Sequence, residues 1–273
     1  MQNAPTILVF DSGLGGLTVY REVAKARPDA RLLYVADDAF FPYGDHGETE
    51  LVARVVALIG ELIEARRPDL VVIACNTAST LVLPQLRARF SVPFVGTVPA
   101  IKPACAASAT RRVSVLGTQA TVAREYTRAL IRDFANGADI TLVGSARLAG
   151  FAEAELRGEP VEDAAIAQEI APCFVDEGSR RTDIVVLACT HYPLLLERFA
   201  RLAPWPVTFI DPAPAIARRV VDLIGPPADR EAPKPAQIVF TSGQPPSPAL
   251  VAALSSFGLS AAERRFDSPP LSA

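Results

Sequence analysis

Two cysteines end two copies of the same seven-residue run, and we expect chemistry at these residues first. Asp69 to Cys75 reads DLVVIAC and Asp183 to Cys189 reads DIVVLAC, so the copies differ only by two Leu/Ile exchanges and lie 114 residues apart (189 − 75). Each run is short, apolar and rich in valine, which predicts a buried strand. Open α/β sheets place their chemistry at the carboxyl ends of parallel strands, so the two thiols predict one site between two similar halves.

Two thiols that face one flat carbon centre could invert a stereocentre without a cofactor. A thiolate is a base and a thiol is an acid, so one sulfur could remove a proton while the other returns a proton to the opposite face. Such a reaction needs two groups of equal pKa, which two copies of one motif would supply. Because a free thiol has a pKa of about 8.5, each sulfur needs a partner, and we expect Asp11 beside Cys75 and His191 beside Cys189.

Small polar residues follow or neighbour both thiols. Ser12, Asn76, Thr77 and Thr190 are suitable donors for the negative charge that develops when a carbon acid loses its proton. The alternative is structural, since a cysteine that ends an apolar strand is usually buried packing and a lone histidine is more often a cap or core residue. The duplication of the whole context favours a functional pair.

Composition excludes several classes of protein. The 273 residues are half hydrophobic, and the net charge of −3 (27 − 30) comes without a basic block, which argues against nucleic acid as a partner. The four cysteines show no C-x-x-C spacing and there are only two histidines, so neither a metal site nor a disulfide framework is expected. We find no signal segment and no apolar run of about 20 residues, so the expected location is cytoplasmic.

Strands and helices alternate along the chain, which predicts an α/β fold with mainly parallel sheets. We expect two domains with the site in the cleft between them, one formed by residues 1–96 plus 210–273 and the other by 97–209. Single helices are expected at about 117–134 and 161–176, and a stiff proline-rich linker near 226–235. Glu153 and Glu155 are typical of a solvated helix face, and residues 267–273 of a frayed tail.

Two loops are candidates for binding. The glycine loop (residues 11–16, DSGLGG) could approach an anion or could simply be a tight strand-to-helix turn, with Asp11 either capping the helix or facing the cleft. In the aromatic loop FFPYG (residues 40–44), proline and glycine could hold the phenol of Tyr43 or neighbouring amides toward a ligand; the alternative is an aromatic plug.

Five motifs together resemble the glutamate racemases, the cofactor-independent amino-acid racemases that supply bacteria with D-glutamate for peptidoglycan. They are FDSGLGGLTV (10–19), FPYG (41–44), ACNTAS (74–79), VLGTQATV (115–122) and LACTHYPLL (187–195). The resemblance implies two pseudo-symmetric α/β domains, a small-molecule substrate, no cofactor and a possible homodimer, without nucleic-acid or membrane partners.

The resemblance also implies roles for individual residues. Cys75 would act on D-glutamate and Cys189 on L-glutamate, with Asp11, His191 and Glu153 assisting the thiols. The stretch before Glu153 departs from the family pattern, since LAGFA stands at 148–152 in place of a segment richer in proline and valine. Substrate contacts are implied at Asp11, Ser12, Tyr43, Gly44, Asn76, Thr77, Thr190 and His191.

Two alternatives stay open on the sequence alone. The same fold could serve an aspartate or hydantoin racemase, an isomerase or a decarboxylase, although a decarboxylase needs only one of the two cysteines. A non-catalytic bilobal binding protein is the other alternative, but such proteins are usually exported and carry a signal segment.

Overall fold

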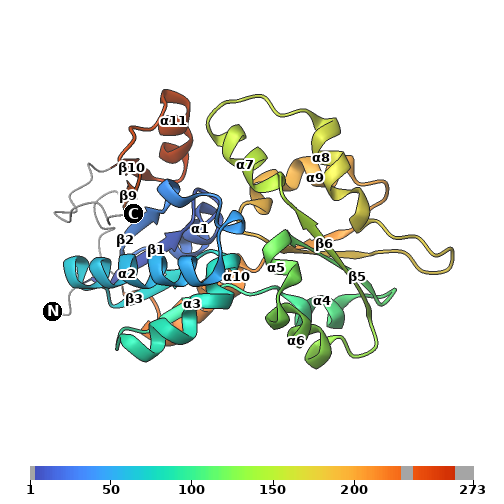
Figure 1. Ribbon diagram of the computed structural model, residues 1–273, viewed down its shortest axis with the longest axis horizontal. Helices are drawn as coiled ribbons and strands as arrows, with labels where there is room; N and C mark the ends of the chain where they lie inside the picture. The colour runs from blue at the N-terminus through green and yellow to red at the C-terminus, as the bar shows by residue number, and fades with distance from the viewer. Residues whose placement is uncertain (1–3, 229–235, 262–273) are drawn as a thin grey trace.

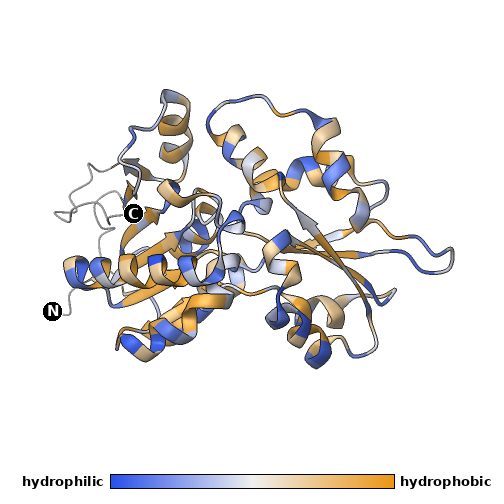
Figure 2. Ribbon diagram, in the orientation of Figure 1, coloured by the Kyte–Doolittle hydropathy of each residue, from blue (hydrophilic) through white to orange (hydrophobic). Residues whose placement is uncertain are grey.

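Two parallel β-sheets, each covered by helices on both faces, make up the chain. The computed structural model describes residues 4–228 and 236–261. Figure 1 shows the two sheets in two bodies side by side, with the first described strand (Thr6–Asp11) and the last (Leu259–Ala261) in the same body. In Figure 2 the strands are mainly orange, while the helices carry both blue and orange, as expected for helices that cover a buried sheet.

The first sheet has six strands in the spatial order β10-β9-β2-β1-β3-β4, and all neighbours are parallel. Every residue of β3 is buried, as is all of β1 except its first residue, because a central parallel strand is covered on both faces. The strands are β1 (Thr6–Asp11), β2 (Arg31–Ala36), β3 (Leu70–Ile73), β4 (Phe94–Gly96), β9 (Ala236–Phe240) and β10 (Leu259–Ala261).

Helices cover this sheet on both sides and complete what we call the first lobe. One face packs against α1 (Leu17–Ala26), α10 (Ala213–Ile224) and α11 (Pro248–Ser256). The other face packs against α2 (Glu48–Arg66) and α3 (Asn76–Arg89). Two short 3₁₀ helices, η1 (Asp38–Phe40) and η2 (Tyr43–Asp45), lie between β2 and α2.

The second sheet has four parallel strands in the order β6-β5-β7-β8 and belongs to the second lobe. The strands are β5 (Arg112–Thr118), β6 (Asp139–Ser145), β7 (Ile184–Ala188) and β8 (Thr208–Ile210). One face packs against α4 (Ile101–Ala107) and α6 (Glu125–Phe134), and the other against α7 (Leu148–Leu156), α8 (Asp163–Ile170) and α9 (Leu196–Leu202). The short α5 (Gln119–Ala123) and the 3₁₀ helices η3 (Ala171–Cys173) and η4 (Tyr192–Leu195) complete it.

The prediction of an α/β fold with mainly parallel sheets is confirmed. We propose the domain division expected from the sequence, 1–96 with 210–273 and 97–209, because the middle of the chain supplies the second sheet. Strand β8 ends at Ile210, one residue beyond that boundary. Within the described ranges, no helix is long and apolar enough to span a membrane.

Local details differ from the sequence-based expectation. The helix predicted over 117–134 is divided into α5 and α6, because Arg124 between them has an extended backbone. The helix predicted over 161–176 is shorter: α8 ends at Ile170, and a 3₁₀ turn containing Pro172 follows. Strand β10 was not predicted. Residues 229–235 of the proline-rich linker and the tail at 267–273 lie outside the described residues.

We predict that Tyr34→Phe destabilises the protein by about 1–3 kcal/mol. The Tyr34 phenol, fully buried beneath the glycine loop, donates a 2.8 Å hydrogen bond to the carbonyl of Gly13, and phenylalanine would leave that carbonyl unpaired. Urea unfolding of both proteins measures the loss. Tyr20→Phe is the matched control, because Tyr20 packs edge-on against Tyr34; equal losses from both changes would contradict the explanation.

Candidate active site

The two predicted thiols line one cavity, each from a different lobe. Cys75 stands just beyond β3 at the start of α3, and Cys189 directly follows β7, so both occupy the carboxyl ends of parallel strands. Both are buried. The cavity is lined by Ser12, Phe41, Pro42, Tyr43, Gly44, Cys75, Asn76, Thr77, Thr118, Ala149, Cys189, Thr190 and His191.

This cavity is small for a metabolite site. Its volume is about 30 Å³, whereas small-molecule pockets usually measure about 300–1,000 Å³. The side chains that line the cavity from the two lobes must therefore move apart to admit a molecule the size of an amino acid.

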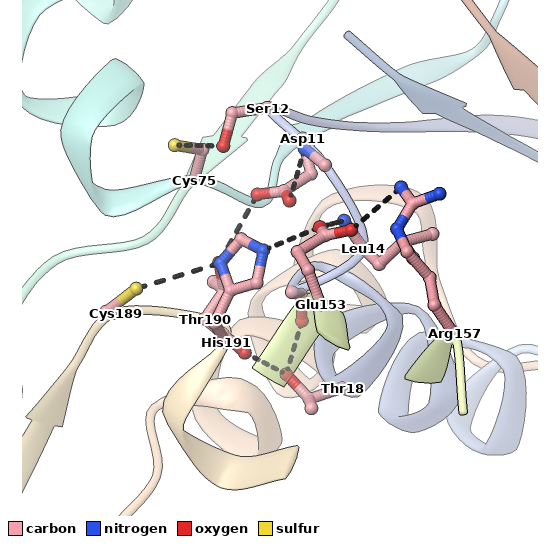
Figure 3. A network of polar contacts seen from close by, with 12 residues as sticks. Asp11, Ser12, Leu14, Thr18, Cys75, Glu153, Arg157, Cys189, Thr190 and His191 are labelled. Carbon is pink, nitrogen blue, oxygen red and sulfur yellow. Dashed lines mark hydrogen bonds and ion pairs between the residues drawn. The ribbon is translucent and has the colours of Figure 1, made fainter. Parts of the chain in front are cut away.

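The structure brings together the residues singled out from the sequence. All of them line the cavity except Asp11 and Glu153, which lie one contact further out. Figure 3 shows this inner network, in which Asp11 and Ser12 come from the glycine loop of the first lobe and His191 and Glu153 from the second. The sequence separation between the two sides is large, since the contact from Leu14 to Glu153 spans 139 residues.

Cys75 has a hydroxyl as its hydrogen-bonding neighbour. Its thiol donates to Ser12 Oγ at 3.6 Å. Burial, together with the negative charge of Asp11, raises the pKa of the Cys75 thiol to about 12. The expectation that Asp11 favours ionisation of Cys75 is therefore wrong for this conformation, because the carboxylate disfavours a second negative charge beside it.

Asp11 instead spans the boundary between the lobes. Its carboxylate accepts the N–H of Gly13 at 3.0 Å and the hydroxyl of Thr190 at 3.3 Å. The side chain is fully buried, which raises the pKa of Asp11 above its usual 3.8, while the nearby His191 acts in the opposite direction. Asp11 thus holds the turn of its own loop and contacts the other lobe, but it neither caps α1, whose N-cap is Gly16 without a side-chain hydrogen bond, nor lines the cavity.

His191 lies between the second thiol and a buried carboxylate. Its Nδ1 is 3.8 Å from Cys189 Sγ, and its Nε2 is 3.0 Å from Glu153 Oε1. Burial alone would lower the pKa of His191, but the contacts with Cys189 and Glu153 outweigh it and raise that pKa well above 6.5. The imidazole therefore contacts both the Cys189 sulfur and the buried Glu153 carboxylate.

Glu153 is buried, so the expectation of a solvated position for it is wrong. It lies on α7, and its Oε1 also accepts the N–H of Leu14 in the glycine loop at 2.6 Å. Burial alone would raise the pKa of Glu153, but the hydrogen bond and charge of His191 outweigh it and lower the pKa below 4.5. Arg157 contacts the other oxygen at 3.2 Å, and this spacing of four residues on one helix was a signal the sequence contained.

The glycines of the loop are explained by close approach. A Cβ on Gly13 would lie 2.4 Å from Glu153 Oε1, and a Cβ on Gly15 would lie 2.4 Å from His191 Nδ1. Any larger residue would push the second lobe away. The loop sequence therefore allows the histidine and glutamate to reach the first lobe.

Asn76 offers unused hydrogen-bonding capacity to the cavity. Both polar atoms of its amide are buried without a partner in the described chain, although the residue lines the cavity at the start of α3. Buried polar groups are nearly always paired, and an unpaired one costs about 1–3 kcal/mol. The amide is therefore available to a polar ligand. The phenol of Tyr43 is not, because it donates to Asp37 at 2.6 Å.

Sequence reasoning missed several residues of the second lobe that reach the first. The hydroxyls of Thr118 and Thr121 lie 3.2 and 3.4 Å from that of Thr77. Arg124 hydrogen-bonds to the carbonyl of Thr77 and, at 2.6 Å, to the hydroxyl of Thr80. The quoted motif VLGTQATV contains both threonines, so their part of the site could have been found from it.

Comparison with known proteins shows the family of this chain. Residues 7–220 match the family described as Asp/Glu/Hydantoin racemase. The chain belongs to this racemase family. A glutamate racemase of Brucella anthropi is 54% identical over 255 residues, which cover 93% of this chain and 92% of the relative.

Solved glutamate racemases share the fold. The Escherichia coli enzyme, crystallised with L-glutamate and the activator UDP-MurNAc-Ala, has a TM-score of 0.86 and 40% identity, covering 94% of this chain and 97% of that one. The Thermus thermophilus enzyme, crystallised with β-chloro-D-alanine, has a TM-score of 0.72 and 28% identity, covering 96% and 97%. Membership of a racemase family confirms the resemblance read from the five motifs.

We predict that Glu153→Gln destabilises the protein in a pH-dependent way. The raised pKa of His191 contributes stability that is fully present below 6.5 and is lost as pH rises through its folded value. The lowered pKa of Glu153 contributes stability that is fully present above 4.5 and is lost as pH falls through its folded value. The difference between wild type and variant is therefore largest between pH 4.5 and 6.5.

Urea unfolding across the pH range measures this difference. Glu155→Gln is the control, because Glu155 lies on the same helix but pairs with Arg198 outside the site. A loss that is constant with pH would show that Glu153 acts only through its shape.

Proposed function

We propose that the protein interconverts L- and D-glutamate by proton transfer at the α-carbon between two thiols. One observation carries the proposal: Cys75 from the first lobe and Cys189 from the second line the same cavity. A carbon held between them would have a sulfur available to each face.

Similarity supports glutamate as the substrate. The Brucella anthropi relative, more than half identical to this chain, is a glutamate racemase. The Escherichia coli relative was crystallised with L-glutamate, which supports a small-molecule substrate here. The unpaired amide of Asn76, with the hydroxyls of Ser12 and Thr77, offers the neutral donors that carboxylates accept.

In the proposed reaction, the Cys189 thiolate removes the α-proton of L-glutamate and becomes a thiol. The electron pair left on the α-carbon delocalises into the adjacent carboxylate, where hydrogen-bond donors stabilise it. The Cys75 thiol then gives its proton to the opposite face and becomes a thiolate, which yields D-glutamate. The reverse reaction exchanges the two roles.

The contacts of the two thiols suit the roles that the reaction from L- to D-glutamate needs at its start, with Cys189 as the base and Cys75 as the acid. We assign the base to Cys189, which lies beside His191, and the raised pKa of Cys75 keeps that thiol protonated as the acid. We assign to Glu153 the role of keeping His191 charged and oriented. We assign to Asp11 the role of keeping the Cys75 thiol protonated, through its negative charge. We also propose that the protein acts in the cytoplasm and supplies D-glutamate for peptidoglycan. This proposal rests on the family resemblance.

We predict that the purified protein converts L-glutamate to D-glutamate in D₂O without added pyridoxal phosphate. The product should carry deuterium at the α-carbon, because the proton returned to the second face comes from a thiol that exchanges with solvent. Chiral chromatography with mass spectrometry measures both. L-aspartate run in parallel tests a second substrate of the three in the family description. Absence of both inversion and exchange with glutamate would reject the proposal.

We further predict that Cys75→Ala and Cys189→Ala each lower racemisation by at least about 10²–10⁴-fold, the contribution usual for general acid–base groups. Each variant should still exchange the α-proton of one isomer: L-glutamate in Cys75→Ala and D-glutamate in Cys189→Ala. Cys105→Ala is the control, because Cys105 is buried on α4 in the core of the second lobe. Exchange of both isomers by either variant would contradict the assignment of one thiol to each face.

A further inference from the structure

One wall of the cavity is a loop tied to a single buried carboxylate. Phe41 to Gly44 line the cavity, and the phenol of Tyr43 donates a 2.6 Å hydrogen bond to Asp37 Oδ2. Asp37 directly follows β2 and is fully buried. Its backbone N–H also donates to the carbonyl of Asp11 at 2.8 Å, so it is joined to the strand that leads into the glycine loop.

Two other elements hold this carboxylate in place. Arg54 on α2 donates to both oxygens, from Nε to Oδ2 at 2.7 Å and from Nη2 to Oδ1 at 2.6 Å. Thr241, just after β9, donates to Oδ1 at 2.7 Å across 204 residues of sequence. The Arg54 guanidinium also lies 4.7 Å from the ring centre of Phe40, so it contacts the start of the same loop.

This network gives Tyr43 a fixed orientation. Burial, together with the charge of Asp37, raises the pKa of the Tyr43 phenol well above 10, so the phenol stays neutral and donates. The residue lines the cavity, yet its hydroxyl is directed to Asp37. Tyr43 therefore shapes the wall without supplying an acid or base to the cavity.

We propose that Asp37 is a positioning residue: through its hydrogen bond with Tyr43 it determines the position of the cavity wall at Pro42 to Gly44. Arg54 and Thr241 in turn hold the Asp37 carboxylate in place. The proposal rests on the proposed function, since it takes this wall to be a contact surface for glutamate. A wall that touches the substrate before, during and after proton transfer contributes uniform binding. Its displacement raises KM while kcat changes little.

We predict that Tyr43→Phe raises KM for both L- and D-glutamate by about tenfold, the equivalent of one lost hydrogen bond. The ring that forms the wall remains in this variant, and only its tie to Asp37 is removed. Thr241→Val and Asp37→Asn should shift KM in the same direction. Asp38→Asn is the control, because Asp38 accepts mainly from the backbone and hydroxyl of Ser242, has a longer 3.4 Å contact with Thr241, and has no contact with the Tyr43 phenol in the described chain.

Amide hydrogen exchange without substrate gives a second measurement that does not depend on catalysis. Residues 39–46 should exchange faster in Tyr43→Phe and Asp37→Asn than in wild type or Asp38→Asn, while the core strand β1 is unchanged. Wild-type KM together with wild-type exchange in Tyr43→Phe would overturn the role of Asp37. An inactive wild-type protein would instead reject glutamate racemisation, and the exchange rates would still decide whether Asp37 positions the loop.

Discussion

The buried pair of Glu153 and His191 is the interaction on which the arrangement of the site depends. Charges taken out of water are costly unless each has a partner, so neither side chain is stable there alone. The Glu153 carboxylate is compensated by its contact with His191 and by the N–H of Leu14, which belongs to the other lobe. The hydrogen bond from Leu14 to Glu153 therefore joins the two lobes, and the contact between Glu153 and His191 orients the imidazole beside Cys189.

The duplicated strands do not produce equivalent thiols. Each copy places a cysteine at the carboxyl end of a central strand, but the neighbours come from elsewhere in the chain. Cys75 has the Ser12 hydroxyl and the negative charge of Asp11, whereas Cys189 has His191. The duplication therefore does not give the two thiols the same surroundings, because these depend on the neighbours and not on the strand.

The polar groups that line the cavity are uncharged apart from His191, whose pKa is raised. The residues that line it include hydroxyls, an amide and a histidine, with no lysine or arginine among them. Arg124 lies behind the lining residues, where it hydrogen-bonds to the carbonyl of Thr77 and forms an ion pair with Glu48 at 3.4 Å.

Local sequence patterns determined the elements and the chemistry they carry. The apolar runs fixed β1, β3 and β7 as buried strands, and the alternation of strands and helices required parallel sheets with the thiols at their carboxyl ends. Only the tertiary structure decided that Glu153 is buried, that Arg124 interrupts a helix, and that Thr241 reaches Asp37. These features depend on contacts between residues dozens to more than two hundred positions apart. Hydrophobic periodicity reports which face of an element is covered, but it carries no information on which distant polar group will compensate a buried charge.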